Sequence, residues 1–222
     1  MRYAFILFLS YSPAAAAAAE PKIAAMFEMA AAPAAVAEPV RALLSPEALV
    51  VKDGDEVVMR VWFRAEIPAK ASPEQVKNGL TYREIPEGTV VGALEFPKTF
   101  IDYRKQELAA GVYTLRFAIQ PDIGDHTGVS PHTEFCLLCP AADDKSADAM
   151  DAKAMIELSS KVNEGRHPAV LMLFPNNAKD DGPTVADKGK GVWAVNVRRA
   201  VVAGEAKTTL GFGITVAGTR KE

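Results

Sequence analysis

The chain has 222 residues, of which 49% are hydrophobic and 24% are charged, with 28 acidic residues against 25 basic ones. This composition is that of a globular protein with one large domain or two small ones, and it excludes disorder of the whole chain. The net charge of −3, without a dense run of Lys or Arg, gives no electrostatic reason to expect a nucleic acid or an anionic membrane as partner.

Residues 1–19 have the layout of a secretory signal peptide. Arg2 precedes a short apolar run, and small residues follow up to Ala19. The run is shorter than the roughly 20 apolar residues that span a bilayer. We expect cleavage after Ala19, with Ala37 as the alternative, because small residues also precede Glu38. No later segment is apolar enough to cross a membrane, so we expect an exported, soluble protein in the periplasm or outside the cell.

Residues 20–43 consist mainly of Ala, Pro and Glu. This composition predicts a flexible or partly helical lead-in, because it offers few large apolar side chains for a core. We therefore place one folded domain at residues 44–222.

The segment from Glu56 to Ile67 alternates between apolar and other side chains, as in a β-strand with one buried face. Asp53-Gly54 predicts a turn before it, so residues 48–52 are expected to pair with it as a hairpin. A second alternating strand is expected at 111–120, where Thr114, Arg116 and Gln120 share the polar face. Further strands are expected at 89–96, 100–103, 135–139, 169–174, 192–198 and 209–216.

Two helices are expected. Ser72, Pro73 and Gly79 have the positions of an N-cap, a first helical residue and a helix end. Residues 143–165 carry an apolar stripe at helical spacing, which predicts an amphipathic helix of about five turns. With about nine strands and short connections, the sequence predicts a mainly β fold: an antiparallel β-sandwich with one amphipathic helix packed on it.

The two cysteines, Cys136 and Cys139, lie in an apolar run that reads as a strand. Three residues of extended chain span about 10 Å, which is too far for an internal disulfide. We therefore interpret both as small buried residues and not as a redox pair.

The loop after Ile119 holds the densest group of side chains that bind metals. Its members are Asp122, Asp125, His126, His132 and Glu134. Imidazole and carboxylate groups together bind zinc or a similar cation, and Gly124, Gly128 and Pro131 would let the loop fold back. No spacing specific to a metal site occurs, so a solvated loop with Asp and His capping its own turns is the competing interpretation.

Residues 102–140 resemble a family of exported bacterial β-rich proteins to which no activity is assigned. The resemblance lies in Asp102-Tyr-Arg-Lys-Gln106, residues 110–115, Gln120-Pro-Asp and Gly124-Asp-His. It implies export and a β-rich body, and it supplies no functional residue.

Two functions follow from these observations. The first is a non-catalytic exported binding or structural module for an extracytoplasmic protein, glycan or small ligand. The second is a metal-binding protein or metal-dependent enzyme that uses the loop from Asp122 to Glu134, with a divalent metal as the one cofactor considered. The sequence assigns no catalytic residue.

Overall fold

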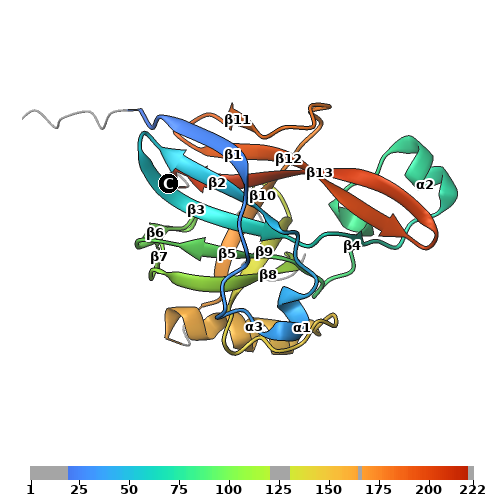
Figure 1. Ribbon diagram of the computed structural model, residues 1–222, viewed down its shortest axis with the longest axis horizontal. Helices are drawn as coiled ribbons and strands as arrows, with labels where there is room; N and C mark the ends of the chain where they lie inside the picture. The colour runs from blue at the N-terminus through green and yellow to red at the C-terminus, as the bar shows by residue number, and fades with distance from the viewer. Residues whose placement is uncertain (1–19, 121–130, 165–166, 220–222) are drawn as a thin grey trace, which may run out of the picture.

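The computed structural model describes residues 20–120, 131–164 and 167–219. In these residues the protein is mainly β, with a curled sheet of eleven strands and a few short helices (Figure 1). The sheet order is β1-β2-β3-β5-β8-β9-β10-β13-β12-β11, and β4 pairs with β12 outside this path. All pairings along this path are antiparallel, whereas β4 runs parallel to β12.

The strands of the curled sheet are β1 (Ile23–Met29), β2 (Glu47–Asp53), β3 (Glu56–Phe63), β4 (Ile67–Pro68), β5 (Val90–Phe96), β8 (Gly111–Ile119), β9 (Glu134–Pro140), β10 (Ala169–Pro175), β11 (Thr184–Asp187), β12 (Trp193–Ala203) and β13 (Ala206–Ala217). A separate small hairpin joins β6 (Phe100–Ile101) to β7 (Glu107–Leu108). The α-helices are α1 (Glu38–Arg41), α2 (Pro73–Asn78) and α3 (Ala152–Ser160), with 3-10 turns at Tyr82–Glu84 and Lys161–Asn163.

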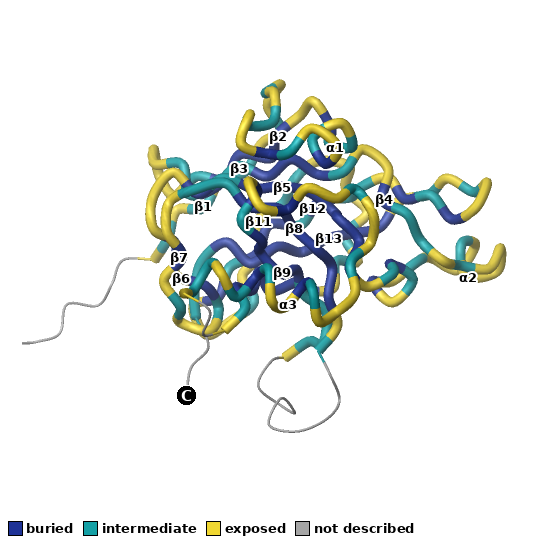
Figure 2. The backbone as a smooth tube through the Cα atoms, turned by 90° about the horizontal axis from the view of Figure 1, so that it is seen from below, coloured by how far each residue is buried: buried dark blue, intermediate teal, exposed yellow. Residues whose placement is uncertain are grey.

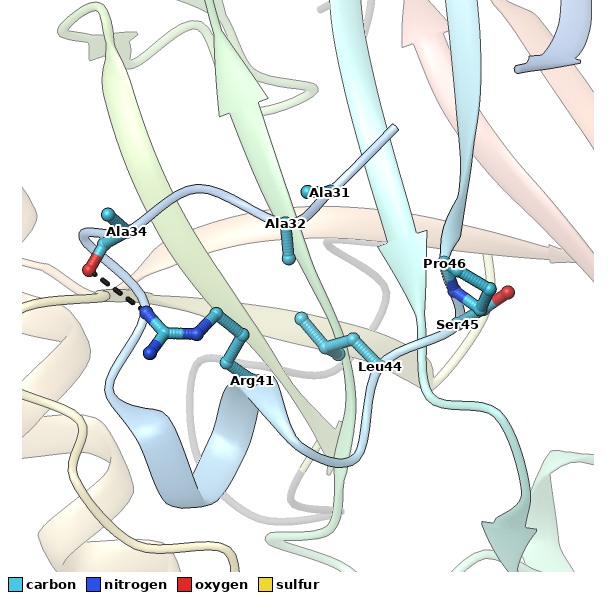
Figure 3. A pocket seen from close by; sticks show the side chains of 7 residues that line it. All are labelled: Ala31, Ala32, Ala34, Arg41, Leu44, Ser45 and Pro46. Carbon is cyan, nitrogen blue, oxygen red and sulfur yellow. Dashed lines mark hydrogen bonds between the residues drawn. The ribbon is translucent and has the colours of Figure 1, made fainter. Parts of the chain in front are cut away.

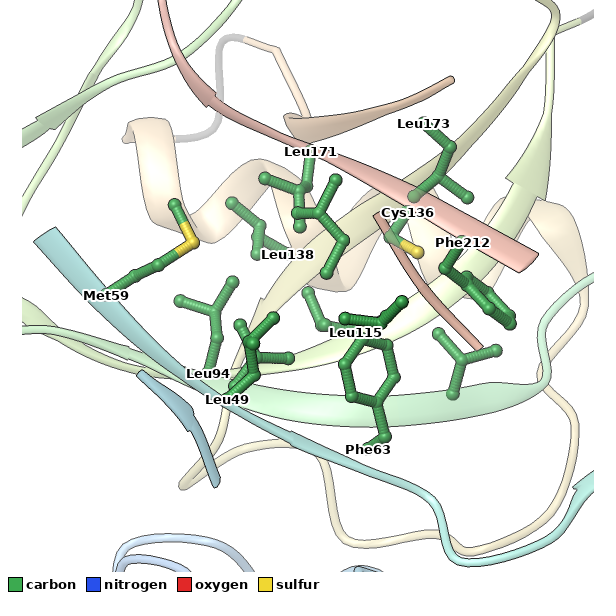
Figure 4. Close-up of a cluster of buried hydrophobic side chains, with 14 of the residues drawn as sticks. Leu49, Met59, Phe63, Leu94, Leu115, Cys136, Leu138, Leu171, Leu173 and Phe212 are labelled. Carbon is green, nitrogen blue, oxygen red and sulfur yellow. The ribbon is translucent and has the colours of Figure 1, made fainter. Parts of the chain in front are cut away.

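The sheet curls until its two edge strands, β1 and β11, lie side by side without pairing (Figure 1). The curl brings strands that are distant in the sheet order into contact across the interior. The rings of Phe63 on β3 and Phe212 on β13, for example, have centroids 5.8 Å apart. One continuous apolar core therefore fills the space that the sheet encloses (Figure 4).

The outer face of the sheet is also largely covered, by the segments that connect the strands. Residues 30–44 lie over β2, β3 and β5, and α3 packs on β9. The buried backbone gathers at the centre of the body, while α2 projects from it with exposed residues (Figure 2). Strand β8 consequently has almost no exposed side chain between Tyr113 and Ala118, although the sequence indicated one polar face.

Residues 20–43 differ from the flexible lead-in that their composition predicts. Ile23–Met29 is β1, paired along its length with β2, and Val36 and Val40 are fully buried. Alanine is disfavoured in strands, but pairing with a strand that is distant in the chain outweighs this low propensity. The ordered conformation of this segment thus depends on tertiary contacts. Residues 1–19, the predicted signal peptide, lie outside the described residues.

The helix predicted at 143–165 is shorter than expected, because α3 begins only at Ala152. The preceding segment is held in irregular conformation by Arg116 on β8. Its guanidinium donates to both carboxylate oxygens of Asp144, at 2.8 and 2.6 Å, and to the carbonyls of Gly88, Ser146 and Asp148. Both Arg116 and Asp144 are fully buried, so this ion pair fastens the segment to the sheet.

Two glycines on β13 allow the close approach of another backbone. A Cβ atom on Gly211 would lie 2.2 Å from the carbonyl oxygen of Asn176, and one on Gly213 would lie 2.6 Å from that of Phe174. Such distances are shorter than any real contact, so only glycine fits there. Among the described residues, no helix has the length and apolar character needed to cross a bilayer.

Candidate functional site

The predicted metal loop is only partly within the described residues. Asp122, Asp125 and His126 lie outside them. His132 lies just before β9, and Glu134 is the first residue of that strand. Among described residues, no group of three or more His, Cys, Asp or Glu side chains is close enough to hold a metal ion. The convergence of all five predicted ligands therefore stays a prediction.

His132 packs against an aromatic ring. Its imidazole meets the ring of Phe174 edge to face, with centroids 5.1 Å apart. Burial lowers the pKa of His132, the nearby cation Lys188 lowers it further, and the carboxylate of Glu134 opposes both. The balance favours the neutral imidazole, the form that binds metals and also the form that packs on an apolar ring.

Glu134 lies close to a cation of the same chain. Its Oε1 is 3.7 Å from Nε of Arg83, a residue of the 3-10 turn at Tyr82–Glu84. The Arg83 side chain is largely exposed, so this pair is worth at most about 1 kcal/mol. Glu134 is thus near both Arg83 and His132. This arrangement is as compatible with a surface ion pair as with a metal site.

The cysteines are free and buried, as the sequence predicts. They lie on opposite faces of β9: Cys136 belongs to the enclosed core, and Cys139 lies on the outer face near Thr114 and Asp144. Burial raises the pKa of both thiols. For Cys139, burial and the nearby carboxylate of Asp144 together raise the pKa to about 12. A thiol with a raised pKa carries little thiolate, so neither residue has the character of a nucleophile.

A groove of about 460 Å³ lies elsewhere, in the segment where the composition predicted no structure. It is formed by residues 31–46, between the end of β1 and the start of β2. Its lining consists of Ala31, Ala32, Ala34, Arg41, Leu44, Ser45 and Pro46. All but Arg41 and Ser45 are apolar, and most are small.

Three contacts fix the walls of the groove. The indole Nε1 of Trp62 on β3 donates to the carbonyl of Ala30 at 2.8 Å, and the amide of Ala30 donates to the carbonyl of Pro46 at 3.0 Å. Val40 in α1 is fully buried against the outer face of the sheet. The segment that follows β1 and the segment that precedes β2 are therefore held a fixed distance apart, and α1 lies between them in the chain.

Arg41 supplies the one charge of the groove. Its Nη1 donates to the carbonyls of Ala34, at 3.3 Å, and Val36, at 3.0 Å, which fixes the direction of the guanidinium. Figure 3 shows Arg41 and Leu44 directed toward Ala34 and Ala32 on the opposite wall. Within the described residues Arg41 has no carboxylate partner, so its remaining N–H groups can meet an acceptor from outside.

Sequence reasoning missed this site because its signal is weak. The helix α1 has only four residues and its N-cap Ala37 makes no side-chain hydrogen bond, so no capping motif marks it. The one usable hint was Trp62, an aromatic side chain on the face of β3 that alternation assigned to water. A large ring on such a face indicates that another segment covers it.

Comparison with known proteins finds no matching family model, no matching curated protein and no matching solved structure. The resemblance of residues 102–140 to exported bacterial proteins therefore stays a prediction, and the function has to be argued from the geometry alone.

Proposed function

We propose that the protein is an exported, non-catalytic binding module that takes a small, mostly apolar ligand in the groove at residues 31–46. In this proposal the curled sheet acts as a β-sandwich scaffold with one amphipathic helix, α3, packed on it. The contact between Phe63 and Phe212 across the interior supports the facing of two layers. The burial of Met155 against β9 and β10 supports the role of α3.

The observation that carries the proposal is the chemistry of the groove. Its volume falls within the range of about 300–1,000 Å³ that is usual for small-molecule sites. Small apolar walls accept an aliphatic or similar group, and the fixed guanidinium of Arg41 selects a ligand that carries a hydrogen-bond acceptor at one end. Beside this cation the lining has one other polar side chain, the hydroxyl of Ser45, and no lining residue is a carboxylate or imidazole that could activate it, which is why we propose binding without catalysis.

Export is part of this proposal, and the position of β1 bears on where the leader would be cleaved. Cleavage after Ala19 leaves Ile23–Met29 in the mature chain, where it pairs with β2. Cleavage after Ala37 would remove this strand and one wall of the groove. We therefore propose Ala19 as the cleavage site, and mass spectrometry of the mature protein from an exporting host should give a chain that begins at Glu20.

The groove is tested with hexanamide, a neutral probe with an apolar body and one acceptor group. Trp62 packs in the same apolar cluster as Ala32 and Leu44, so a Trp193→Phe background leaves a single indole that reports on the groove. We expect a saturable change in Trp62 fluorescence, which Arg41→Met weakens because the donor at the end of the groove is lost.

A matched pair of variants makes this test specific. Ala34 lines the groove and its neighbour Ala35 does not, although both are exposed. Ala34→Leu should abolish the response to hexanamide because the larger side chain fills the groove, and Ala35→Leu should leave it unchanged. A response that both variants keep, or no saturable response in the parent protein, contradicts the proposal.

A further inference from the structure

Arg199 lies on β12, on the face of the sheet that points into the enclosed core. Its neighbours on that face, Val197 and Val201, are fully or almost fully buried. The guanidinium carbon lies 5.2 Å from the ring centroid of Phe27 on β1 and 5.2 Å from that of Phe63 on β3. Two aromatic faces thus hold the cation in one place, through the attraction of a positive charge to the electrons of the ring.

The donors of this guanidinium have no acceptor. Among the described residues no hydrogen bond or ion pair is made by Arg199, and its Nε is buried from solvent without a partner. Buried polar groups in folded proteins are almost always hydrogen-bonded, so an unpaired one calls for an explanation. The nearest influence is the carboxylate of Glu47, which raises the pKa of Arg199 while burial, the larger effect, lowers it.

The edge of β12 beside Arg199 is not fully paired. On the edge of β12 that faces away from β13, β11 ends opposite Asn196, and β4 begins only opposite Val201. Between these points no described strand pairs with that edge. The Arg199 side chain is partly exposed, and nearby β1 ends in Met29, which is 75% exposed. A small anion can therefore approach the guanidinium between β1 and β12.

The surroundings select the kind of anion. The two phenylalanine rings offer apolar contact, and Glu47 on β2 adds a negative charge that opposes a multiply charged ligand. An arginine fork matches the two oxygens of a carboxylate, which accept two parallel N–H bonds. A singly charged acid with an apolar body satisfies all three conditions, whereas inorganic phosphate satisfies only the last.

We propose that Arg199, between Phe27 and Phe63, is a binding site for the carboxylate group of a small aliphatic or aromatic monocarboxylic acid. This site is separate from the groove at residues 31–46 and does not depend on it. The acid accepts hydrogen bonds from the fork of Arg199 and places its apolar part against the rings.

The test follows the side-chain Nε–H signal of Arg199 by NMR in the ¹⁵N-labelled full mature protein, assigned by its loss in Arg199→Lys. Sodium hexanoate is titrated at constant ionic strength against sodium chloride. We expect a saturable shift of this signal with hexanoate and none with chloride. Inorganic phosphate, added in a separate titration, should give a weaker response than hexanoate.

The matched control is Arg198, the next residue on the same strand. Arg198 points to the other face of the sheet, where it donates to the carbonyl of Ala178 and to Oγ1 of Thr209. Arg198→Lys should keep the hexanoate shift of Arg199. Arg199→Met should lose the rise in melting temperature that hexanoate gives the parent, since only binding to the folded state produces such a rise.

Three results would overturn the proposal. They are the absence of a saturable hexanoate shift at Arg199 in the parent protein, tighter binding of phosphate than of hexanoate, and an undiminished hexanoate effect on the melting temperature of Arg199→Met. The first two are measured on the unaltered sequence, and the Arg199→Lys variant serves only to assign the signal. The groove experiment with neutral hexanamide reports on Trp62 and is independent of all three.

Discussion

Arg116 and Arg199 are both strand residues removed from most or all contact with water, yet the fold treats them in opposite ways. Arg116, on the outer face of β8, uses every N–H of its guanidinium: three go to backbone carbonyls and two to Asp144. Arg199, on the inner face of β12, lies against the rings of Phe27 and Phe63 and has no acceptor within the described residues.

The difference separates a structural charge from a candidate recognition site. A buried charge with all its hydrogen bonds made has no capacity left for a ligand, and it fastens one segment to another. A cation that is held in place but unpaired has that capacity, at a cost to stability. The four predictions below test this contrast, in order of decreasing effect.

The largest effect is expected from Arg116→Met. The change leaves the carboxylate of Asp144 buried and unpaired, which should lower the free energy of unfolding by about 3–5 kcal/mol. Urea unfolding followed by circular dichroism measures the loss. The double variant Arg116→Met with Asp144→Leu should recover part of it, because the second change removes the stranded charge. A loss below about 1 kcal/mol would show that the pair does not fasten residues 141–150 to the sheet.

Arg199→Met is expected to act in the opposite direction. Removing an unpaired buried donor gains about 1–3 kcal/mol, while the lost attraction to two rings costs about 0.5–1 kcal/mol for each ring. With the middle of each range, a gain of about 2 kcal/mol against a cost of about 1.5 kcal/mol for the two rings, the free energy of unfolding in urea should rise by about 0.5 kcal/mol. A loss as large as that of Arg116→Met would mean that Arg199 is a structural charge too, and the contrast would disappear.

Asp102 provides a case between the two arginines, in the turn between β6 and β7. Its Oδ1 accepts the amides of Arg104 and Gln106, each at 2.8 Å, whereas its Oδ2 is buried without a partner. Burial raises the pKa of Asp102 and the amides of Gln106 and Arg104 oppose the rise. A carboxyl group whose pKa is raised on folding does not affect stability at acid pH, where it is protonated in the folded and the unfolded protein. It destabilises the folded protein as the pH rises from the unfolded-state pKa through the folded-state pKa.

Asp102→Asn removes this pH dependence and keeps an oxygen for the two amides. At pH 7 the variant should be more stable than the parent, and the difference should vanish toward pH 3, below the usual pKa of about 3.9. Urea unfolding at a series of pH values gives the comparison. A difference that grows as the pH falls has the wrong sign for a raised pKa and would refute this account.

The smallest effect is expected at the loop that the sequence marked as a metal site. If the protein is a binding module without metal, His132→Ala and His126→Ala should each shift the melting temperature only slightly, and equally with and without a chelator. Protein purified without an affinity tag should contain no stoichiometric zinc or copper by elemental analysis. Stoichiometric metal that is lost when both histidines are changed would instead establish the metal-dependent alternative.

How far the sequence predicts this fold depends on how local each signal is. The strands Glu56–Phe63 and Gly111–Ile119, the turn at Asp53-Gly54 and the capped helix α2 are read from neighbouring residues, and the structure has all of them. The polar face that alternation indicated for β8 is buried instead. The strands β4, β7 and β11 have two to four residues each, too few for a periodic pattern, and they were missed.

The candidate sites follow the same rule. Sequence reasoning selected His132 and Glu134 because their side chains are themselves metal ligands. It passed over the groove because Ala31, Ala32 and Ala34 carry no functional group, and only their placement opposite Arg41 makes a site. It also left Arg199 in an ordinary strand, since nothing near it in the chain indicates that Phe27 and Phe63 enclose it.

The sequence by itself therefore determined the mainly β character of the fold, the position of most of the main strands and the burial of both cysteines, because these depend on side chains one or two residues apart. The tertiary structure decided that residues 23–29 join the sheet, that Arg116 is covered by residues 141–150, and that Arg199 has no acceptor in the part of the chain that the structure describes. The physical reason is that an arginine on a strand has the same local sequence whether water, a carboxylate or an aromatic ring lies above it. Only the path of distant segments settles which of them does.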